Sequence, residues 1–319
     1  MPVYNCERFL TASIDSVLTQ TLTGFEFIII NDGSTDTSED IINSYQDPRI
    51  RYIKNSQNRG IVATLNHGLK MSRGKYVARM DADDIASPDR LSKQLAYMEN
   101  NPNCKLCGSQ AYGLNSGGKR LYQLNRPLKH DQIKVFNFFR NAFIHPAIIA
   151  DAETIKGYAY QETYKYAEDY FLFSQITMHH KVANLKQRCL NYRIHGESIT
   201  ISKTSEMISS EVKTVKYLLS FLFDEVSERM LLLHHSILRP ENTSFSLSEM
   251  ENYLFSISVA NMKSQIFDQY FLDKQLQKEW YNILLRSGDK KSVMTYLSSR
   301  LFRIKHFNFK QLFKLMLIK

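Results

Sequence analysis

Residues 1 to about 200 alternate between short apolar runs and stretches with helical periodicity. The run at residues 25–30 is apolar and β-branched and ends in the turn residues 31–34, which is typical of a buried strand. The same pattern predicts further strands at residues 50–53, 76–78 and 105–107. Helices are predicted at residues 37–45, at residues 60–71 and after Pro88. This alternation predicts an α/β fold with a mostly parallel sheet covered by helices.

The character of the sequence changes near residue 200. Strand patterns end, Gly and Pro become scarce, and Leu, Ser, Glu and Lys dominate. The chain has 319 residues, which is enough for one large domain or two of ordinary size. We therefore expect one α/β domain over residues 1–200 and a separate, mainly helical region over residues 201–319.

Composition is that of a folded protein. Apolar residues make up 43% of the chain and charged residues 23%, which argues against global disorder. Four cysteines are too few for a disulfide scaffold. No stretch reaches the roughly 18 apolar residues that a membrane-spanning helix needs, and the N-terminus does not have the pattern of a secretory signal. A reducing, cytoplasmic location is the resulting expectation.

The positive charge is concentrated near the C-terminus. The chain carries 41 basic and 32 acidic residues, a net charge of +9, and residues 290–319 contain no acid. The eight basic residues of this tail are Lys290, Lys291, Arg300, Arg303, Lys305, Lys310, Lys314 and Lys319. Aromatic and aliphatic residues are interleaved with them at helical spacing, which predicts a basic amphipathic helix. Such a helix either lies on an anionic membrane surface or packs on its own domain with a solvated basic face.

Three carboxylates follow the predicted strand at residues 76–78. Asp81, Asp83 and Asp84 lie within four residues and repel one another unless they are paired. Either they form a solvated acidic turn before the next helix, or they bind a divalent cation, since Mg²⁺ and Mn²⁺ prefer hard oxygen ligands. In parallel sheets, ligands bind beyond the carboxyl ends of the strands, which is where this cluster is predicted to lie.

Three other positions are candidates for chemistry. Asp32 lies in the predicted turn after the strand at residues 25–30, where it either accepts hydrogen bonds from a ribose or base or forms a local turn. Tyr4 either stacks on a base or packs in the core. Glu168 and Asp169 begin a helix, where the helix dipole stabilises them, and they are also placed to act as a general base.

Taken in order, these motifs resemble glycosyltransferase family 2, whose members are inverting enzymes with the GT-A fold, a Rossmann-like α/β fold. The matching segments are residues 2–5, 31–36, 58–60 with Ala63 and Asn66, 74–84, 88–91, 168–169 and 192–196. The resemblance covers residues 1 to about 200 and does not extend to residues 201–319.

The resemblance implies roles for individual residues. The donor nucleotide would be held by Pro2, Val3, Tyr4, Asp32, Asn58, Arg59, Asp81 and Ala82. Asp83 would bind Mn²⁺ or Mg²⁺ at the donor diphosphate, and His195 is a second candidate ligand or else a loop histidine hydrogen-bonded to the backbone. Asp169 would be the catalytic base, with Glu168 beside it to orient the acceptor.

The activity implied is transfer of a sugar from a nucleotide-diphosphate sugar to a hydroxyl group with inversion. A UDP-sugar is the expected donor, with GDP- and dTDP-sugars as alternatives. The expected acceptor is a glycan or lipid-linked sugar in surface polysaccharide or lipo-oligosaccharide assembly. We expect a location at the inner face of the plasma membrane, with peripheral membrane contact through residues 290–319.

Two other functions stay open at this point. Family members usually carry an apolar strand before the segment that matches residues 2–5, so we expect an upstream start or a truncation, and a sugar-nucleotide-binding protein without catalysis is one alternative. A basic nucleic-acid-binding protein is a weaker alternative, because no nucleic-acid module is recognisable. We therefore expect no nucleic-acid partner.

Three further signals receive structural interpretations. Cys104 and Cys107 fall on a predicted strand without a second pair, so we expect buried thiols. The His pairs at residues 179–180 and 234–235 have no ligand partners at suitable spacing, and we interpret them as helix-surface residues. His145 lies in a segment that shapes the acceptor pocket in the family.

Overall fold

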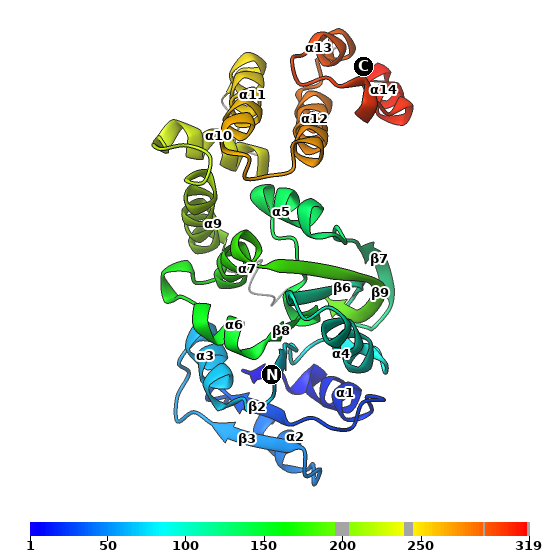
Figure 1. Ribbon diagram of the computed structural model, residues 1–319. Coiled ribbons are helices and arrows are strands. Elements are labelled where there is room, and N and C mark those ends of the chain that lie inside the picture. The colour runs from blue at the N-terminus through cyan, green and yellow to red at the C-terminus, as the bar shows by residue number, and fades with distance from the viewer. Residues whose placement is uncertain (195–203, 239–244, 290, 318–319) are drawn as a thin grey trace. The chain divides into compact units, whose positions relative to one another are not determined.

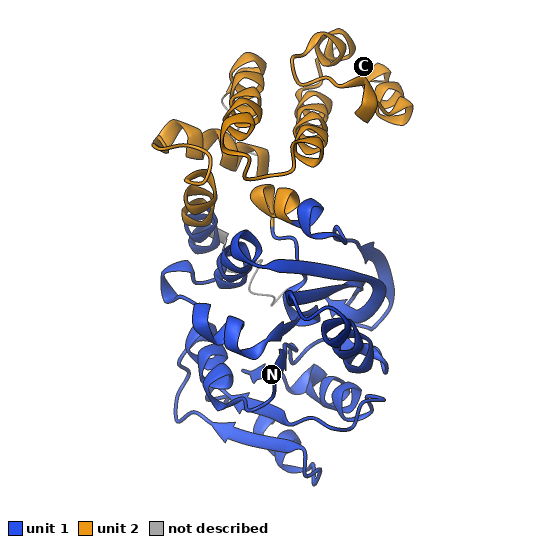
Figure 2. Ribbon diagram, in the orientation of Figure 1, with its two compact units in different colours: residues 1–133, 141–211 blue, residues 134–140, 212–319 orange. Residues whose placement is uncertain are grey.

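The computed structural model describes residues 1–194, 204–238, 245–289 and 291–317. The chain forms two compact units, which Figure 2 distinguishes by colour. The first contains residues 1–133 and 141–211, and the second contains residues 134–140 and 212–319.

The first unit begins with a three-stranded parallel sheet. Its elements are β1 (Pro2–Val3), α1 (Glu7–Leu18), β2 (Phe27–Asn31), α2 (Ser38–Asn43), β3 (Ile50–Lys54) and α3 (Ile61–Met71). The strand order is β1-β2-β3, and all pairs are parallel. β2 is almost entirely buried and carries three consecutive isoleucines, as expected for a strand covered on both faces.

A second, six-stranded sheet follows in the same unit. Its strands are β4 (Tyr76–Ala78), β5 (Ile85–Ala86), β6 (Cys104–Leu114), β7 (Arg120–Leu124), β8 (Ile149–Asp151) and β9 (Lys181–Arg193). The order is β4-β8-β6-β9-β5, and β7 pairs with β6 as a hairpin. β6 and β9 are parallel, whereas the other pairs are antiparallel. The α/β class is thus confirmed. The strands of this second sheet are mostly antiparallel, whereas the alternation of strands and helices in the sequence predicted a mostly parallel sheet.

Helices and short 3₁₀ turns connect these strands (Figure 1). They are α4 (Arg90–Asn100), η1 (His145–Ala147), α6 (Ala152–Tyr158), η2 (Glu162–Tyr164) and α7 (Glu168–His179). The strands predicted near residues 50 and 76 and the helix that follows Pro88 are confirmed. Cys104 and Cys107 lie in β6 as buried free thiols, as predicted.

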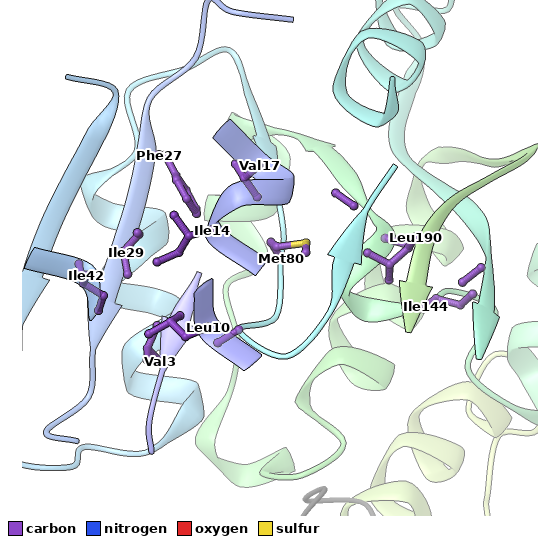
Figure 3. Close-up of a cluster of buried hydrophobic side chains, with 14 residues drawn as sticks. Val3, Leu10, Ile14, Val17, Phe27, Ile29, Ile42, Met80, Ile144 and Leu190 are labelled. Carbon is purple, nitrogen blue, oxygen red and sulfur yellow. The ribbon is translucent and has the colours of Figure 1, made fainter. Parts of the chain in front are cut away.

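A buried apolar cluster connects α1 to the two sheets of this unit. Figure 3 shows side chains of the cluster from α1, β2 and the segment after β4. Its labelled members are Val3, Leu10, Ile14, Val17, Phe27, Ile29, Ile42, Met80, Ile144 and Leu190. Each fully buried aliphatic or aromatic side chain contributes about 1.5–3 kcal/mol relative to exposure. This cluster therefore holds in place the strand ends from which the candidate site is built.

The second unit is helical throughout its described residues. It contains most of α5 (His130–Phe139), the second half of α9 (Thr204–Leu219), then α10 (Glu228–Leu238), α11 (Leu247–Ser264), α12 (Gln269–Ser287), α13 (Ser292–Ser298), η4 (Ile304–His306) and α14 (Phe309–Met316). A capping box between Ser246 and Glu249 begins α11, and Gly288 in the left-handed conformation ends α12. Among the described residues, no helix combines the length and apolar character that crossing a bilayer requires.

One prediction about the second unit is wrong. His234 is fully buried, not on a helix surface. Its Nδ1 lies 2.8 Å from the Tyr253 hydroxyl and its Nε2 lies 2.9 Å from the Phe138 carbonyl oxygen. Burial lowers the pKa of His234 to about 4. Because both partners come from other helices, the pattern of α10 alone could not indicate this role.

Candidate active site

Asp32 lies at the carboxyl end of β2 and holds the segment between β3 and α3. Its buried carboxylate accepts hydrogen bonds from the Asn55 side chain at 2.7 Å and from the backbone N–H groups of Arg59 and Gly60 at 2.9 Å. Gly33 permits the close approach of these segments, because its φ is 72° and a Cβ there would lie 2.7 Å from the Asn58 nitrogen. Asp32 therefore does more than form a local turn, because it binds a segment more than twenty residues further along the chain.

The end of β1 lies directly beside Asp32. The Asp32 N–H donates to the Val3 carbonyl oxygen at 2.8 Å, which continues the pairing of β1 with β2. The Tyr4 side chain is 51% exposed, so the interpretation that it packs in the core is wrong. Asn5, with φ 46°, accepts a hydrogen bond from the Thr35 N–H at 2.8 Å. The segments after β1 and β2 are therefore tied together at one sheet edge.

The remaining residues that were predicted to bind the donor nucleotide or its cation differ in their burial. Asn58 and Arg59 have exposed side chains in the segment that Asp32 orders. Ala82 is buried in the apolar cluster, which leaves its backbone as the group available to a ligand. His195 lies outside the described residues.

The acidic cluster after β4 brings three carboxylates together. Asp81, Asp83 and Asp84 each offer an oxygen, and these oxygens all lie within 4.8 Å of one another. Asp84 is buried, and the Arg193 N–H donates to its Oδ1 at 2.7 Å. Its Oδ2 has no hydrogen-bond partner among the residues that the structure describes. A solvated acidic turn therefore does not account for Asp84.

Burial raises the pKa of Asp84 well above its ordinary value, and the charges of Asp81 and Asp83 raise it further. A buried carboxylate with an unpartnered oxygen beside two others is costly unless positive charge is close. An oxygen-rich site of this kind fits Mg²⁺ or Mn²⁺, which accept one or two carboxylates together with phosphate oxygens. The residues present therefore fit the cation that the sequence predicts.

Two buried arginines hold the turn that contains the cluster. Arg79 forms an ion pair with Asp81. Arg90 donates to the Arg79 carbonyl oxygen at 2.6 Å, and burial lowers the pKa of Arg90 to about 10. The Arg193 guanidinium donates to the Asp83 carbonyl oxygen at 2.8 Å. Arg79, Arg90 and Arg193 lie in segments that carry the family resemblance, but the sequence assigned them no role, because their contacts come from segments distant in the chain.

Glu168 and Asp169 begin α7 and are both sheltered from solvent. Burial raises the pKa of each carboxyl, and the charge of Asp169 raises that of Glu168 further. The helix dipole alone would lower both pKa values, so burial is the stronger effect here. Glu168 Oε2 is buried and has no hydrogen-bond partner within the described part of the chain. Stabilisation by the helix dipole therefore does not by itself explain why two acidic residues are buried at the start of α7.

Polar neighbours orient Asp169. The Asn141 side-chain amide donates to Asp169 Oδ2 at 2.8 Å, and the Tyr170 N–H donates to Oδ1 at 2.7 Å. His145 Nδ1 lies 4.0 Å from the same Oδ2, and its Nε2 lies 2.8 Å from the Tyr160 hydroxyl. Burial and the charge of Arg79 lower the pKa of His145, which keeps the imidazole neutral. Asn141 and Tyr160 carry no motif that would have revealed them.

The charges of the acidic cluster and of the carboxylates of α7 affect the pKa values of the same side chains. Asp81 raises the pKa of Asp169, and Arg79 lowers it. Tyr192, on β9, has its pKa raised by burial and by the charges of both groups, those of Asp81 and Asp169 among them. Electrostatic effects of this kind fall off with distance, so the acidic cluster and Asp169 lie near one another. This arrangement can hold a phosphorylated ligand beside a general base.

The family model described as "Glycosyl transferase family 2" matches residues 1–159. An uncharacterized glycosyltransferase of Methanocaldococcus jannaschii, MJ1057, is 35% identical over 222 residues, which are 68% of this chain and 77% of that protein. An uncharacterized glycosyltransferase of Haemophilus influenzae is 30% identical over 286 residues, 85% of this chain and 84% of that protein. The chain therefore belongs to glycosyltransferase family 2, and it is a glycosyltransferase.

One relative that matches over a shorter segment, and two solved structures of lower sequence identity, have names or titles that state a ligand. Escherichia coli WfaP, a UDP-Glc:alpha-D-GlcNAc-diphosphoundecaprenol beta-1,3-glucosyltransferase, is 41% identical over 96 residues, 30% of this chain and 38% of its own length. S. aureus TarS 1-349 in complex with UDP-GlcNAc has a TM-score of 0.59 at 16% identity, covering 93% of this chain and 86% of TarS. Mannosyltransferase PcManGT from Pyrobaculum calidifontis in complex with GDP-Man and Mn²⁺ has a TM-score of 0.54 at 12% identity, covering 98% and 84%. These structures establish the GT-A fold.

The buried state of Glu168 predicts a pH-dependent change in stability. Because the pKa of Glu168 is raised on folding, its charged form costs folding free energy at neutral pH, and this cost vanishes below its ordinary pKa near 4. Glu168→Gln should therefore raise the melting temperature at pH 8 by about 2–4 °C, the shift that about 1 kcal/mol produces in a domain of this size. At pH 4 the two proteins should melt together.

Glu153→Gln is the matched control, because Glu153 also lies in the first turn of a helix but is exposed. It should lower the melting temperature slightly or leave it unchanged at pH 8. A Glu168→Gln protein that melts like the parent at both pH values would contradict the burial of this carboxylate.

Proposed function

We propose that this glycosyltransferase moves a hexosyl or N-acetylhexosaminyl group from a UDP-sugar to a hydroxyl of a glycan or lipid-linked acceptor, with inversion at the anomeric carbon. The observation that supports this most directly is the cavity lined by both Arg79, the ion-pair partner of Asp81, and Tyr160, whose hydroxyl lies 2.8 Å from His145, the neighbour of Asp169. A donor diphosphate at the cluster and a base at α7 would lie on either side of a transferred sugar.

In this proposal the donor nucleotide binds at the ends of β1 and β2. The exposed ring of Tyr4 is available to stack on a base, while Pro2 and Val3 present backbone groups. Asp32 orders the segment that carries Asn58 and Arg59, and this would place the Arg59 guanidinium beside the donor nucleotide. Backbone groups at Ala82 would complete the site.

Asp83 and Asp84 would hold a divalent cation, with Asp81 shared between that site and Arg79. When bound, Mn²⁺ or Mg²⁺ would offset the negative charge that develops on the departing diphosphate. The unpartnered Oδ2 of Asp84 supports this assignment and adds Asp84 to the predicted ligand Asp83. Asp81 would also face the donor ribose, as the family resemblance implies.

Asp169 would be the general base. Its carboxylate accepts the proton of an acceptor hydroxyl as the hydroxyl oxygen bonds to the anomeric carbon. The bond from that carbon to the diphosphate oxygen breaks on the opposite face, and the nucleoside diphosphate leaves with the electron pair. The raised pKa of Asp169 makes it a stronger base than an exposed aspartate, while Asn141 fixes the carboxylate plane and Glu168 orients the acceptor.

The choice of donor rests on the ligands named for similar proteins. TarS is described in complex with UDP-GlcNAc, and WfaP is named for transfer from UDP-Glc to a diphosphoundecaprenol-linked sugar. These names support a UDP-sugar donor and a lipid-linked acceptor in surface polysaccharide or lipo-oligosaccharide assembly. PcManGT is described with GDP-Man, so a GDP-sugar is the rival donor that a binding screen must include.

A second part of the proposal concerns the end of the chain. Apolar side chains of η4 and α14 are exposed, with Ile304 at 83%, Phe309 at 79% and Phe313 at 61%. Leu315 is buried on the other side of α14, and Lys310 and Lys314 are exposed. A surface that joins exposed aromatic and aliphatic groups to lysines, in a segment without acids, suits an anionic lipid surface. We infer peripheral contact with the inner face of the plasma membrane there, near a lipid-linked acceptor.

Replacing the proposed base tests the reaction. Asp169→Asn should lower the transfer rate at least about a thousandfold, because the amide cannot accept the acceptor's proton and general base catalysis contributes about 10²–10⁴-fold. Binding of UDP-sugar, measured by calorimetry, should stay within a few-fold. Asp131→Asn is the control, since Asp131 is the exposed second residue of α5 as Asp169 is the second residue of α7. Full transfer by Asp169→Asn would exclude Asp169 as the base.

Binding of the cation is tested without catalysis. UDP with Mn²⁺ should raise the melting temperature of the parent protein, because a ligand that binds the folded state stabilises it. In Asp83→Asn and Asp84→Asn, this rise should fall to that seen with UDP and EDTA. Asp89→Asn, at a half-buried aspartate in the following turn, should retain it. Equal rises with and without Mn²⁺ in the parent protein would contradict the metal site.

The membrane contact is tested by vesicle flotation. Lys310→Gln/Lys314→Gln should weaken binding to vesicles containing phosphatidylglycerol about thirtyfold, since each basic residue near the surface contributes about 1 kcal/mol. Phe309→Ser/Phe313→Ser should weaken binding as well, whereas Lys181→Gln/Lys186→Gln, at exposed lysines of β9, should not. Equal flotation of all variants would rule out this surface as the site of contact.

A further inference from the structure

His145 lies between the proposed base and a buried hydroxyl group. Its Nδ1 is 4.0 Å from Asp169 Oδ2, and its Nε2 is 2.8 Å from the Tyr160 hydroxyl. The imidazole packs edge to face against Phe173 of α7, with the ring centroids 5.6 Å apart. Each ring nitrogen therefore has its own polar neighbour, and the ring is packed on the helix that carries Asp169.

Tyr160 is held in place from α3. The Tyr160 N–H donates to Asn66 Oδ1 at 2.9 Å, and Asn66 Nδ2 donates to the Tyr160 carbonyl oxygen at 2.8 Å. The tyrosine is buried, and burial raises the pKa of its hydroxyl, which keeps its proton at neutral pH. The hydroxyl is thus a positioned partner for His145 with one hydrogen to donate.

The chemistry of these neighbours determines which nitrogen of His145 carries the proton. Burial and the charge of Arg79 lower the pKa of His145, so the imidazole is neutral and has a single N–H group. An ionised carboxylate only accepts hydrogen bonds, so the N–H is most stable on Nδ1, where it faces Asp169. Nε2 is then an acceptor, and the Tyr160 hydroxyl is able to donate to it.

We propose that His145 is a positioning residue for sugar transfer, which carries its proton on Nδ1 toward Asp169 Oδ2 and is held in this tautomer by the Tyr160 hydroxyl. The inference rests on the proposed function, because it takes Asp169 as the general base. Together with the Asn141 amide, His145 places two N–H donors at Oδ2, whereas Oδ1 accepts only the Tyr170 N–H among the printed contacts of the described chain. Oδ1 is then the oxygen with capacity to take the proton of the acceptor hydroxyl.

Donors at Oδ2 stabilise the ionised form of Asp169. Hydrogen bonds to a carboxylate lower its pKa, and they oppose the burial that raises the pKa of Asp169 to about 6. Hydrogen bonds of catalytic groups are often long before the substrate binds and shorten in the complex, which applies to the 4.0 Å separation here. The titratable and charged groups that lie near Asp169 or act on it are Glu168, Arg79, Asp81, His145, Tyr160 and Tyr192.

The tautomer is measured directly by ¹⁵N NMR of the histidine side chains, since protonated and unprotonated ring nitrogens differ in chemical shift. In the parent protein at neutral pH, we expect the proton of His145 on Nδ1, with the signals assigned by their loss in His145→Asn. A proton on Nε2 would overturn the proposal. Because this measurement needs no transfer, it separates failure of this inference from failure of the proposed function.

The pH dependence of kcat tests the effect on the base. His145→Phe removes the N–H donor, which makes ionised Asp169 less stable, so its pKa should rise and the acidic limb of the profile should move to higher pH by about one unit. His145→Asn places an amide N–H near the position of Nδ1 and should move the limb less than half as far. Tyr160→Phe should move it in the same direction as His145→Phe.

The matched control is Tyr158→Phe. Tyr158 and His180 form a second tyrosine–histidine pair in the same unit, with the hydroxyl 3.2 Å from Nε2, and neither residue contacts Asp169 in any described interaction. This variant should keep the parent profile. An acidic limb that stays in place in both His145→Phe and Tyr160→Phe, whatever the fall in kcat, would show a merely structural role and overturn the proposal.

Discussion

The buried guanidinium of Arg79 is the charge on which the site depends. It forms an ion pair with Asp81 in the acidic cluster, and its charge lowers the pKa of Glu168 and Asp169 at the start of α7. In a region of low dielectric, carboxylates at such positions repel one another strongly unless positive charge is near. The positive charge of this one side chain thus reduces the cost of placing the acidic cluster and the carboxylates of α7 near one another.

The backbone around this charge is held by contacts that span the chain. Asp32 binds N–H groups from the segment before α3, and Arg193 at the end of β9 binds Asp84 and the Asp83 carbonyl. Arg90 in α4 binds the carbonyl of Arg79 itself. These contacts connect the loops at the strand ends to the helices and strands around them, and in proteins generally such loops on a scaffold carry the functional groups.

The sequence predicted the elements well where a single pattern decides them. Apolar β-branched runs became β2, β3 and β4, and the acids of the cluster follow β4 as expected. Strand direction was less predictable, because β8 and β7 pair antiparallel with β6 through long-range contacts that no local pattern encodes. His234 was misread for a similar reason, since its partners Tyr253 and Phe138 lie on other helices.

Local pattern alone therefore established the α/β class, the helical second half and the candidate residues Asp32, Asp83 and Asp169. Tertiary packing decided which carboxylates are buried, which of their oxygens lack a hydrogen-bond partner among the described residues, and which arginines offset their charge. It buried Asp84 within the predicted cluster and placed the Asn141 amide 2.8 Å from Asp169 Oδ2. The physical reason is that desolvation and Coulomb energy depend on neighbours brought from distant parts of the chain, whereas periodicity and turn chemistry depend on residues nearby in sequence.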